Sequence, residues 1–356
     1  MNKDLKKFIL VIGIYLLGIV GLICGTNYFV DASSTINPKH DKMAKLALEG
    51  NVISLPENYN HRVFQRCIVD NMETLPSAIV IGSSRGMYLG KDITGIEDIY
   101  NNCVGGASIE DYFGLLGLYQ NKFNELPETI IIEVSPWVFY KDNPENRWIE
   151  DKEYKNACID FYKEVTGNTL KINKNLEKEN PYLSLSYFRY NVEQLLKQGT
   201  AVFEEVAKVS DSLEEMVDNP DGTIRYRYAL ENESEERLEI VKNISGPCTY
   251  QNSDKMIKVD EKIAESFENL IDYLLKQGKE LILYVQPFSV TQCEYALEQN
   301  LNPAYPLVYD YLVNLASEKE IPLKGNFDPR VYGIGDEYFI DFMHLDKKGT
   351  AITWND

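Results

Sequence analysis

The sequence predicts an α/β layered fold with a parallel sheet, attached to one N-terminal membrane-spanning helix. Three short apolar runs, at residues 77–81, 129–134 and 281–285, have the length and composition of buried parallel strands. Segments with apolar residues three and four positions apart lie between and beside these runs, as expected for amphipathic helices. Strands that alternate with helices in this way indicate parallel βαβ units.

Composition restricts the classes of function. The chain has 356 residues, of which 55 are acidic and 36 basic, and its formal net charge is −19. Most nucleic-acid-binding functions are excluded, because binding phosphates needs a basic excess or a basic stripe. The six cysteines are scattered and form neither a CxxC pair nor a Cys/His cluster, so no metal or disulfide-dense scaffold is indicated. Only three histidines are available as a general base: His40, His61 and His344.

The first element is a predicted transmembrane helix over residues 8–30. These 23 residues carry no charge, and at 1.5 Å per residue such a helix crosses a hydrocarbon core of about 30 Å. Three lysines lie in the preceding tail, residues 1–7, whereas the first charge after the helix is Asp31. The positive-inside rule therefore predicts a cytoplasmic N-terminus and an extracytoplasmic remainder.

Two other interpretations of this segment exist. A cleaved signal peptide needs a shorter apolar stretch and a small-x-small site, for which only Asp31-Ala32-Ser33 is a weak match. A lipoprotein site at Cys24 has bulky Ile23 where a small residue is expected. The exported part carries a net charge of −21 and would be repelled by anionic lipid, so the helix itself is expected to hold the protein at the membrane.

The elements that follow are predicted in chain order. Residues 31–75 are polar and are predicted to form a stalk with a short helix around 39–49, and residues 76–356 to form the α/β domain. Within that domain a helix is expected at 109–119, between the second and third strands. Apolar residues from Met256 to Leu274 predict another helix, which ends before Gly278 and leads into the strand at 281–285.

Residues from about 140 to 250 interrupt the alternation of strands and helices. They are rich in Lys, Glu, Asn and Tyr, and are predicted to form a mainly helical insertion over the core. A helical stripe runs from Val202 to Met216, and Asn219-Pro220-Asp221-Gly222 predicts a turn after it.

Ser84 is a candidate nucleophile. The first strand runs directly into Gly82-Ser83-Ser84, which puts a hydroxyl at the carboxyl edge of a parallel sheet, where open α/β folds bind ligands. The same residues also suit a plain strand-to-helix turn with a serine cap.

Asp341 and His344 are the candidate partners of that serine. An Asp three residues before a His can orient one imidazole nitrogen and leave the other free to accept a serine proton, as an acyl-transfer triad requires. A capped helix start with a chance histidine is the alternative. Both motifs are expected on loops at one edge of the sheet, although about 260 residues separate them.

These blocks resemble those of the SGNH, or GDSL-like, hydrolase superfamily. Gly82-Ser83-Ser84 is similar to its Gly-Asp-Ser block, with Ser83 in place of Asp, and Asp341-Phe342-Met343-His344 to its Asp-x-x-His block. Residues 101–106 are similar to its Asn-x-Gly-x-x-Gly block, with Cys103 replacing the first glycine. The resemblance covers about residues 76–135 and 280–352. It implies a three-layer, flavodoxin-like fold and an oxyanion hole formed by the amides of Ser84 and Gly106.

One block departs from the family pattern. After the third strand the family usually has Gly-x-Asn, whose Asn side chain is an oxyanion donor, whereas this chain has Glu133-Val134-Ser135. Ser135 is a speculative substitute for that donor. Loss of one such donor typically costs about 2.7–4 kcal/mol of transition-state stabilisation.

The departure and the membrane helix together resemble a subset of the superfamily that modifies cell envelopes. This subset includes the D-alanyl transfer protein of lipoteichoic acid assembly and membrane-attached acetyltransferases of exopolysaccharides such as alginate. The resemblance implies a serine acyltransferase or esterase without a cofactor or metal, acting on an envelope glycan or teichoic acid. If the reaction is transfer, a multi-pass membrane protein is expected to supply the acyl group.

Two other functions stay open at this point. One is a catalytically inactive SGNH-fold protein that binds glycan or scaffolds an envelope complex, and the other is an esterase of lipids or small esters. Arg85 could neutralise an anionic substrate, or be a solvated or paired side chain. His40 and His61 have no acidic or hydroxyl partner nearby in sequence and are expected at the surface.

Overall fold

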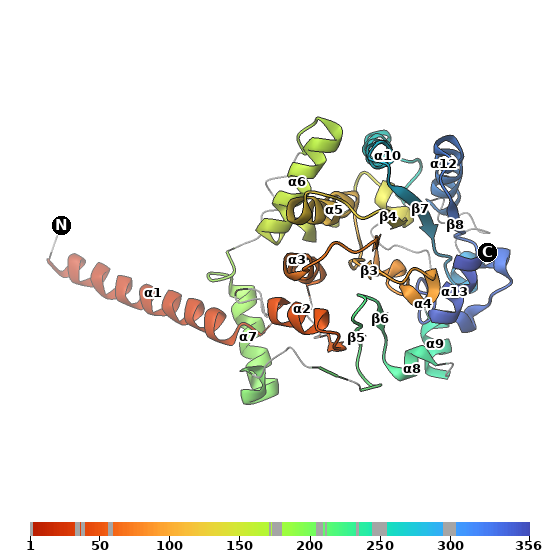
Figure 1. Cartoon of the computed structure of the whole chain (residues 1–356). Helices are drawn as coiled ribbons and strands as arrows, with labels where there is room; N and C mark the ends of the chain where they lie inside the picture. Colours follow the sequence, from red (N-terminus) through yellow and green to blue (C-terminus); the bar gives the residue numbers. More distant parts are fainter. Residues whose placement is uncertain are drawn as a thin grey trace.

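Among the described residues, five strands form a parallel sheet at the centre of the chain (Figure 1). They are hydrogen-bonded in the order β3-β2-β4-β7-β8, and every neighbouring pair is parallel. The strands are β2 (Ala78–Ile81), β3 (Ile99–Asn101), β4 (Thr129–Glu133), β7 (Glu280–Val285) and β8 (Leu323–Gly325). The predicted α/β class and parallel sheet are confirmed, and the three apolar runs correspond to β2, β4 and β7.

The structure is a computed structural model that describes most of the chain. The described residues are 3–32, 36, 40–55, 60–170, 172, 180–203, 209–210, 212–232, 235–243, 255–294 and 304–356. Part of the helical stripe predicted from Val202 to Met216 lies outside these ranges.

Helices lie on both sides of the sheet. In Figure 1, α10 (Glu261–Lys276) and α12 (Ala304–Lys319) are on one side, with α4 (Lys91–Thr94) and α13 (Lys347–Asn355) on the other. The predicted helix at 109–119 is α5 (Ile109–Phe123). The helix predicted from Met256 begins at Glu261, because the Asp260 side chain accepts hydrogen bonds from the amides of Lys262 and Ile263 and caps it there.

The prediction of a stalk over residues 31–75 is wrong for the described part. The short helix is present as α2 (His40–Leu48), but α2 and α3 (His61–Asn71) belong to the main core. Met43, Phe64 and Ile68 are buried in the same cluster as the strands of the sheet, and α3 packs against α5. Burial of these apolar side chains stabilises the folded state, and a stalk in free solution would have no core in which to bury them.

The insertion predicted at about 140–250 is mainly helical in its described part, but it also contains strands. Its helices are α6 (Lys152–Thr166), which packs on α5, then α7 (Leu185–Gln198), α8 (Tyr228–Glu231) and α9 (Glu235–Asn243). A hairpin of β5 (Val217–Asp218) and β6 (Ile224–Arg225) pairs antiparallel with β1 (Ile53–Ser54).

The turn of that hairpin is the predicted Asn219–Gly222, in which Gly222 has a φ of 77°. The predicted helical stripe is wrong at its described C-terminal end. Val209 forms a bridge with Ile53, and the Met216 carbonyl accepts the Leu55 amide at 3.0 Å rather than a helical hydrogen bond. Pairing with a distant strand prevails there over a local helical pattern.

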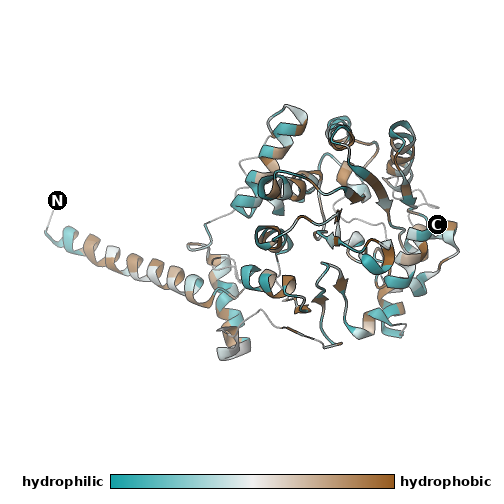
Figure 2. Cartoon of the chain, viewed as in Figure 1, coloured by the Kyte–Doolittle hydropathy of each residue, from teal (hydrophilic) through white to brown (hydrophobic). Residues whose placement is uncertain are grey.

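The N-terminal helix α1 (Lys3–Val30) projects away from the sheet domain (Figures 1 and 2). It is long and apolar enough to cross a membrane, and no residue of its most apolar window is buried within the protein. In Figure 2 the ribbon of α1 carries the brown colour of hydrophobic residues along most of its length.

Candidate active site

Ser84, His344 and Asp341 form a continuous series of hydrogen bonds. Ser84 is the first residue of a 3-10 turn (Ser84–Gly86) that follows β2, and His344 lies in the loop before α13. The distance from Ser84 Oγ to His344 Nε2 is 2.8 Å, and that from His344 Nδ1 to Asp341 Oδ2 is also 2.8 Å. The structure therefore brings together the three residues that the sequence predicted, across 260 positions of chain.

The Asp341 carboxylate is held in place by its own loop. Its Oδ1 accepts hydrogen bonds from the amides of Met343 and His344, at 2.8 and 2.9 Å. Burial opposes ionisation of this carboxyl, but the charge and hydrogen bond of His344 outweigh it, so the pKa of Asp341 lies below its usual range. An ionised Asp341 favours the tautomer with hydrogen on Nδ1, which leaves Nε2 free to accept the Ser84 proton.

A buried carboxylate shapes the turn that carries the nucleophile. Glu133, the last residue of β4, accepts the amide of Ser83 on Oε2 and the hydroxyl of Ser135 on Oε1, each at 2.6 Å. The hydroxyls of Ser83 and Ser135 also lie 3.0 Å apart. This network holds Ser83 by both its amide and its hydroxyl, and the fixed Ser83 positions Ser84 just after β2.

Gly82→Ala is expected to destabilise this turn by about 1–3 kcal/mol. Gly82 has a φ of 148°, and a Cβ there would lie 2.6 Å from Glu133 Cβ and 2.7 Å from the Glu133 carbonyl oxygen. Denaturant unfolding of both variants measures the effect against Gly95→Ala, whose φ is 75° but whose added Cβ would meet nothing within 4 Å. An equal loss of unfolding free energy in the two variants would mean that backbone strain alone destabilises them and that Glu133 does not constrain the turn.

The predicted oxyanion residues lie on loops that are hydrogen-bonded to each other. The amide of Val104 donates to the Gly82 carbonyl at 2.9 Å, and the Asn101 side chain donates to the Gly86 carbonyl at 2.8 Å. Gly106 has a φ of 61°, a conformation that favours glycine. Among the described residues, the amides of Ser84 and Gly106 have no acceptor, so both are available to an oxyanion.

Ser135 does not replace the missing donor. Its side chain is fully buried, and its hydroxyl donates to Glu133. The Ser135 hydroxyl is therefore already used within the protein and is not aimed at the Ser84 side of the turn as a free donor.

Arg85 is a paired side chain, which is one of the alternatives predicted for it. It is buried, and its guanidinium donates to the carbonyls of Gln286, Pro287 and Met343 and lies 4.0 Å from the ring centroid of Phe288. These contacts join the Ser84 turn to the end of β7 and to the loop of His344, so Arg85 positions the two halves of the site.

The expectation that His40 and His61 lie at the surface is wrong for His40. His40 is buried, and its Nε2 accepts the Asn60 amide at 3.3 Å. Burial lowers the pKa of His40 to about 4, helped by the charge of Arg66. His61 is partly buried beside Gly105, and burial with the charges of Arg62 and Arg147 lowers its pKa to about 3. Both imidazoles are neutral at neutral pH.

The free energy of unfolding is expected to fall on acidification in a His40-dependent way. The folded-state pKa is about 4 and the unfolded one 6.5, so the unfolded chain binds the extra proton and stability is lost as the pH falls from 6.5 toward 4. The full loss from this group is about 3 kcal/mol. Denaturant unfolding at neutral pH and at pH about 4 should show a smaller acid loss in His40→Gln. An unchanged loss would contradict the assignment.

Sequence reasoning missed the ion pair of Arg62 and Asp111. Both side chains are fully buried, and Arg62 Nε and Nη2 donate to the two Asp111 oxygens at 2.8 and 2.7 Å. Arg62 Nη1 also donates to the Gly105 carbonyl at 3.3 Å, next to the amide of Gly106. No local signal marks this pair, because its members are 49 positions apart in sequence.

Arg237 of α9 was also missed, and it ties the insertion to the loop of His344. Its buried guanidinium donates to the carbonyls of Phe339 (2.6 Å) and Glu337 and pairs with Asp346 at 2.7 Å. The insertion thus contacts both ends of the segment that carries Asp341 and His344.

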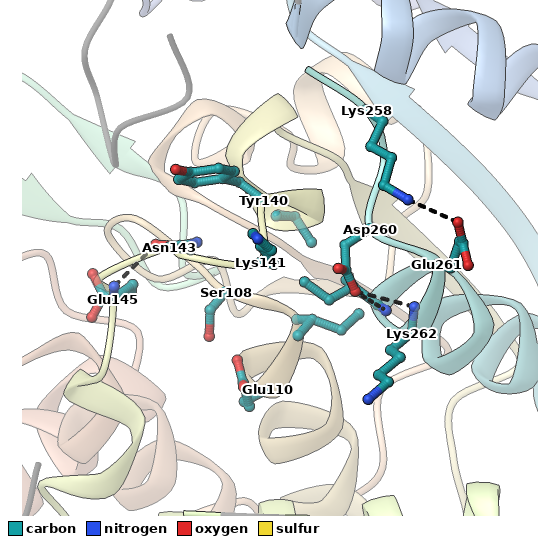
Figure 3. Close-up of a pocket in the computed structure, with 13 residues that line it drawn as sticks. Ser108, Glu110, Tyr140, Lys141, Asn143, Glu145, Lys258, Asp260, Glu261 and Lys262 are labelled. Atoms are coloured by element: carbon teal, nitrogen blue, oxygen red, sulfur yellow. Dashed lines mark hydrogen bonds and ion pairs between the residues drawn. The ribbon is translucent and has the colours of Figure 1, made fainter. Parts of the chain in front are cut away.

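A separate cavity of about 520 Å³ opens beside the start of α5 (Figure 3). Ser108 and Glu110, the segment 140–145 and the start of α10 line it, and Lys258 pairs with Glu261 there at 2.9 Å. Burial raises the pKa of Glu110. None of Ser84, Gly106, Asp341 or His344 lines this cavity.

Among the described residues, no group of three His, Cys, Asp or Glu side chains could hold a metal ion.

Comparison with known proteins adds no family assignment to this geometry. No protein-family model matches the chain, and a search of curated proteins found none that matches it.

Proposed function

We propose that the chain is a membrane-anchored, extracytoplasmic serine acyltransferase or esterase that acts on acyl groups of cell-envelope polysaccharide or teichoic acid. The observation that carries this proposal is the series of hydrogen bonds from Ser84 through His344 to Asp341. A serine, an imidazole and a carboxylate in this order form the machinery of acyl transfer on several unrelated folds.

In the proposed reaction, the order of the hydrogen bonds determines the path of the proton. Ser84 Oγ attacks the acyl carbonyl carbon while His344 Nε2 takes the hydroxyl proton, and the oxyanion is stabilised by the amides of Ser84 and Gly106. The bond to the leaving alcohol breaks as His344 returns the proton to it. An acceptor hydroxyl or water then attacks the acyl-serine by the same steps in reverse order, which regenerates Ser84.

The finer fold assignment is part of the proposal. Counted in chain order, the strands of the parallel sheet are arranged 2-1-3-4-5, as in flavodoxin-like folds, and helices lie on both sides. The direction in which successive strands are added to the sheet reverses beside β2. The Ser84 turn follows β2, so it lies at the point where open α/β sheets bind ligands. This arrangement, with the three sequence blocks, supports a three-layer SGNH-like fold.

The location proposed is the outer face of the cell membrane. It rests on α1, on the lysines that precede its apolar stretch, and on the charge of −21 of the chain beyond residue 30. For transfer rather than hydrolysis, a multi-pass membrane protein would deliver the acyl group from the cytoplasmic side.

Labelling with a fluorophosphonate tests the proposal. The intact chain in detergent should form a covalent adduct, because an activated serine attacks this probe. Ser84→Ala should abolish the adduct, whereas Ser317→Ala, which removes an exposed hydroxyl of α12, should keep it. Turnover of a short acyl ester with and without a glycan acceptor would then distinguish transfer from simple hydrolysis.

The second candidate function is an inactive glycan-binding or scaffolding protein. The observation that favours it is the engagement of the Ser135 hydroxyl by Glu133, which leaves the third oxyanion donor of the family pattern without a replacement there. An inactive protein would give no Ser84-dependent adduct while still binding glycan.

A further inference from the structure

The end of α1 is joined to α7 by a set of buried polar contacts. The Asn27 side chain donates to the carbonyls of Pro181 (2.8 Å), Tyr182 (3.1 Å) and Ser184 (3.0 Å). Asn191 of α7 donates to Asn27 Oδ1 at 3.2 Å. Both asparagine side chains are fully buried, so the anchor helix and the insertion are fixed to each other at this point.

Further contacts satisfy the polar groups around this junction. Asn191 Oδ1 accepts the Ala32 amide at 2.9 Å, and Asp31 accepts the Tyr187 hydroxyl at 2.5 Å. A turn that meets the bilayer must satisfy its backbone groups within the protein, because water is scarce there. The two hydrogens of the Asn27 amide are shared among three carbonyls of the segment that leads into α7.

Large apolar side chains surround the junction and are exposed. We define the interface surface as Tyr28, Phe29, Tyr182, Leu183, Leu185 and Leu196. Phe29 is 74% exposed, Leu183 54% and Leu196 81%. Tyr28 stacks on Tyr182 with ring centroids 6.4 Å apart, which makes the surface continuous from α1 to the turn. Tyrosine and other aromatic residues are enriched at the level of lipid head groups.

The apolar part of α7 forms one stripe. Leu185 and Leu196 are eleven positions apart, which brings them to nearly the same face of an α-helix, and half-buried Val192 lies on that face as well. Arg189 is exposed between them. A long arginine side chain at this position can bury its stem among lipids and extend its charge to a phosphate.

The orientation of α7 fits a bilayer surface. Figure 1 shows α7 lying across the end of α1 rather than in line with it. A helix that crosses a spanning helix at its membrane exit lies along the membrane plane. The exposed residues Phe29 and Leu183 are then at the level where the apolar stretch of α1 ends.

We infer that the interface surface is embedded in the membrane–water interface on the extracytoplasmic side of the membrane that α1 crosses. In this arrangement α7 is a second, non-spanning attachment of the domain to lipid. The inference rests on the proposed passage of α1 through the membrane. Continuity with the lipid-facing surface of α1 favours lipid over a protein partner as the occupant. The attachment would hold the sheet domain in a fixed orientation above the bilayer.

Quenching of tryptophan fluorescence by brominated lipid tests this. The full chain is placed in nanodiscs of phosphatidylcholine and phosphatidylglycerol in equal parts, with bromine either near the head or near the end of the acyl chains. The native tryptophans, Trp137, Trp148 and Trp354, are buried in the sheet domain and give the baseline. The variants are Leu183→Trp and Leu196→Trp, with Ile257→Trp as the control at an apolar residue 84% exposed just before α10. Leu16→Trp, within α1, reports on the anchor.

Leu183→Trp and Leu196→Trp should lose fluorescence, and more with bromine near the head group. Leu16→Trp should be quenched more by bromine near the chain end, and Ile257→Trp should stay at the baseline. If Leu16→Trp is quenched while the two interface variants match Ile257→Trp, the anchor holds and the inference is wrong, which would leave the surface to a protein partner. If Leu16→Trp is not quenched, the anchor itself fails, and the inference with it. Fluorophosphonate labelling of the same samples reports independently on the proposed activity.

Discussion

Replacing Asp341 with asparagine is expected to lower acyl-ester turnover by about four orders of magnitude while the chain stays folded. An asparagine can still accept the amides of Met343 and His344, which Asp341 bonds at 2.8 and 2.9 Å, so the loop keeps its shape. Its amide nitrogen would then face His344 Nδ1 as a donor. The imidazole would place its hydrogen on Nε2, where it can no longer take the proton of Ser84.

Turnover of a short acyl ester by the intact chain in detergent measures this effect. Asp310→Asn is the matched control, because Asp310 is exposed on α12 and distant in sequence from the site. Denaturant unfolding should give similar midpoints for both variants, which separates a tautomer effect from a loss of structure. Turnover by Asp341→Asn within a few-fold of the unaltered chain would rule out a catalytic role for the Asp341–His344 pair.

The sequence predicted the parts of the fold that local patterns determine. The runs in β2, β4 and β7 are continuous and apolar because the strands are buried on both faces, and such runs are recognisable without a structure. β3 and β8 have three residues each, too few for a periodic signal. The hairpin of β5 and β6 depends on pairing with β1, more than 150 positions earlier, which no local pattern records.

The site divides in the same way, into residues that local motifs reveal and residues whose partners come from distant segments. Ser84, Asp341 and His344 stood in short motifs next to predicted elements, and the structure places them within hydrogen-bond distance of one another. Arg85 and His40 look like surface residues in sequence, because charged and titratable side chains are usually exposed. They are buried here through partners that come from distant segments, such as the Met343 carbonyl for Arg85. The roles of such residues become visible only when the chain is folded.

Breaking the buried pair of Arg62 and Asp111 is expected to have the largest effect on stability. Arg62→Met leaves the Asp111 carboxylate buried without its cation, which costs about 3–5 kcal/mol. The remaining partners of Asp111 are the Tyr154 hydroxyl at 3.0 Å and the amide and hydroxyl of Ser108 at 2.8 and 3.3 Å, and none of them neutralises its charge. The measurement is denaturant unfolding, with Arg227→Met as control. Arg227 pairs with Glu236 at the surface, where an ion pair contributes about 0–1 kcal/mol.

The same variant tests whether this pair supports the oxyanion loop. The Gly105 carbonyl accepts hydrogen bonds from Arg62 at 3.3 Å and from Arg147 at 2.7 Å, so loss of Arg62 should leave the peptide next to Gly106 with one of its two donors and loosen it. The double variant Arg62→Met/Asp111→Leu removes both charges and should recover much of the lost stability, because the desolvated carboxylate is gone. Since it does not restore the Arg62 hydrogen bond to Gly105, it should recover less of the turnover than of the stability. Equal recovery of turnover and stability would mean that the pair acts on the core alone. A loss of stability in Arg62→Met no greater than that in Arg227→Met would show that breaking the buried pair carries no energetic penalty.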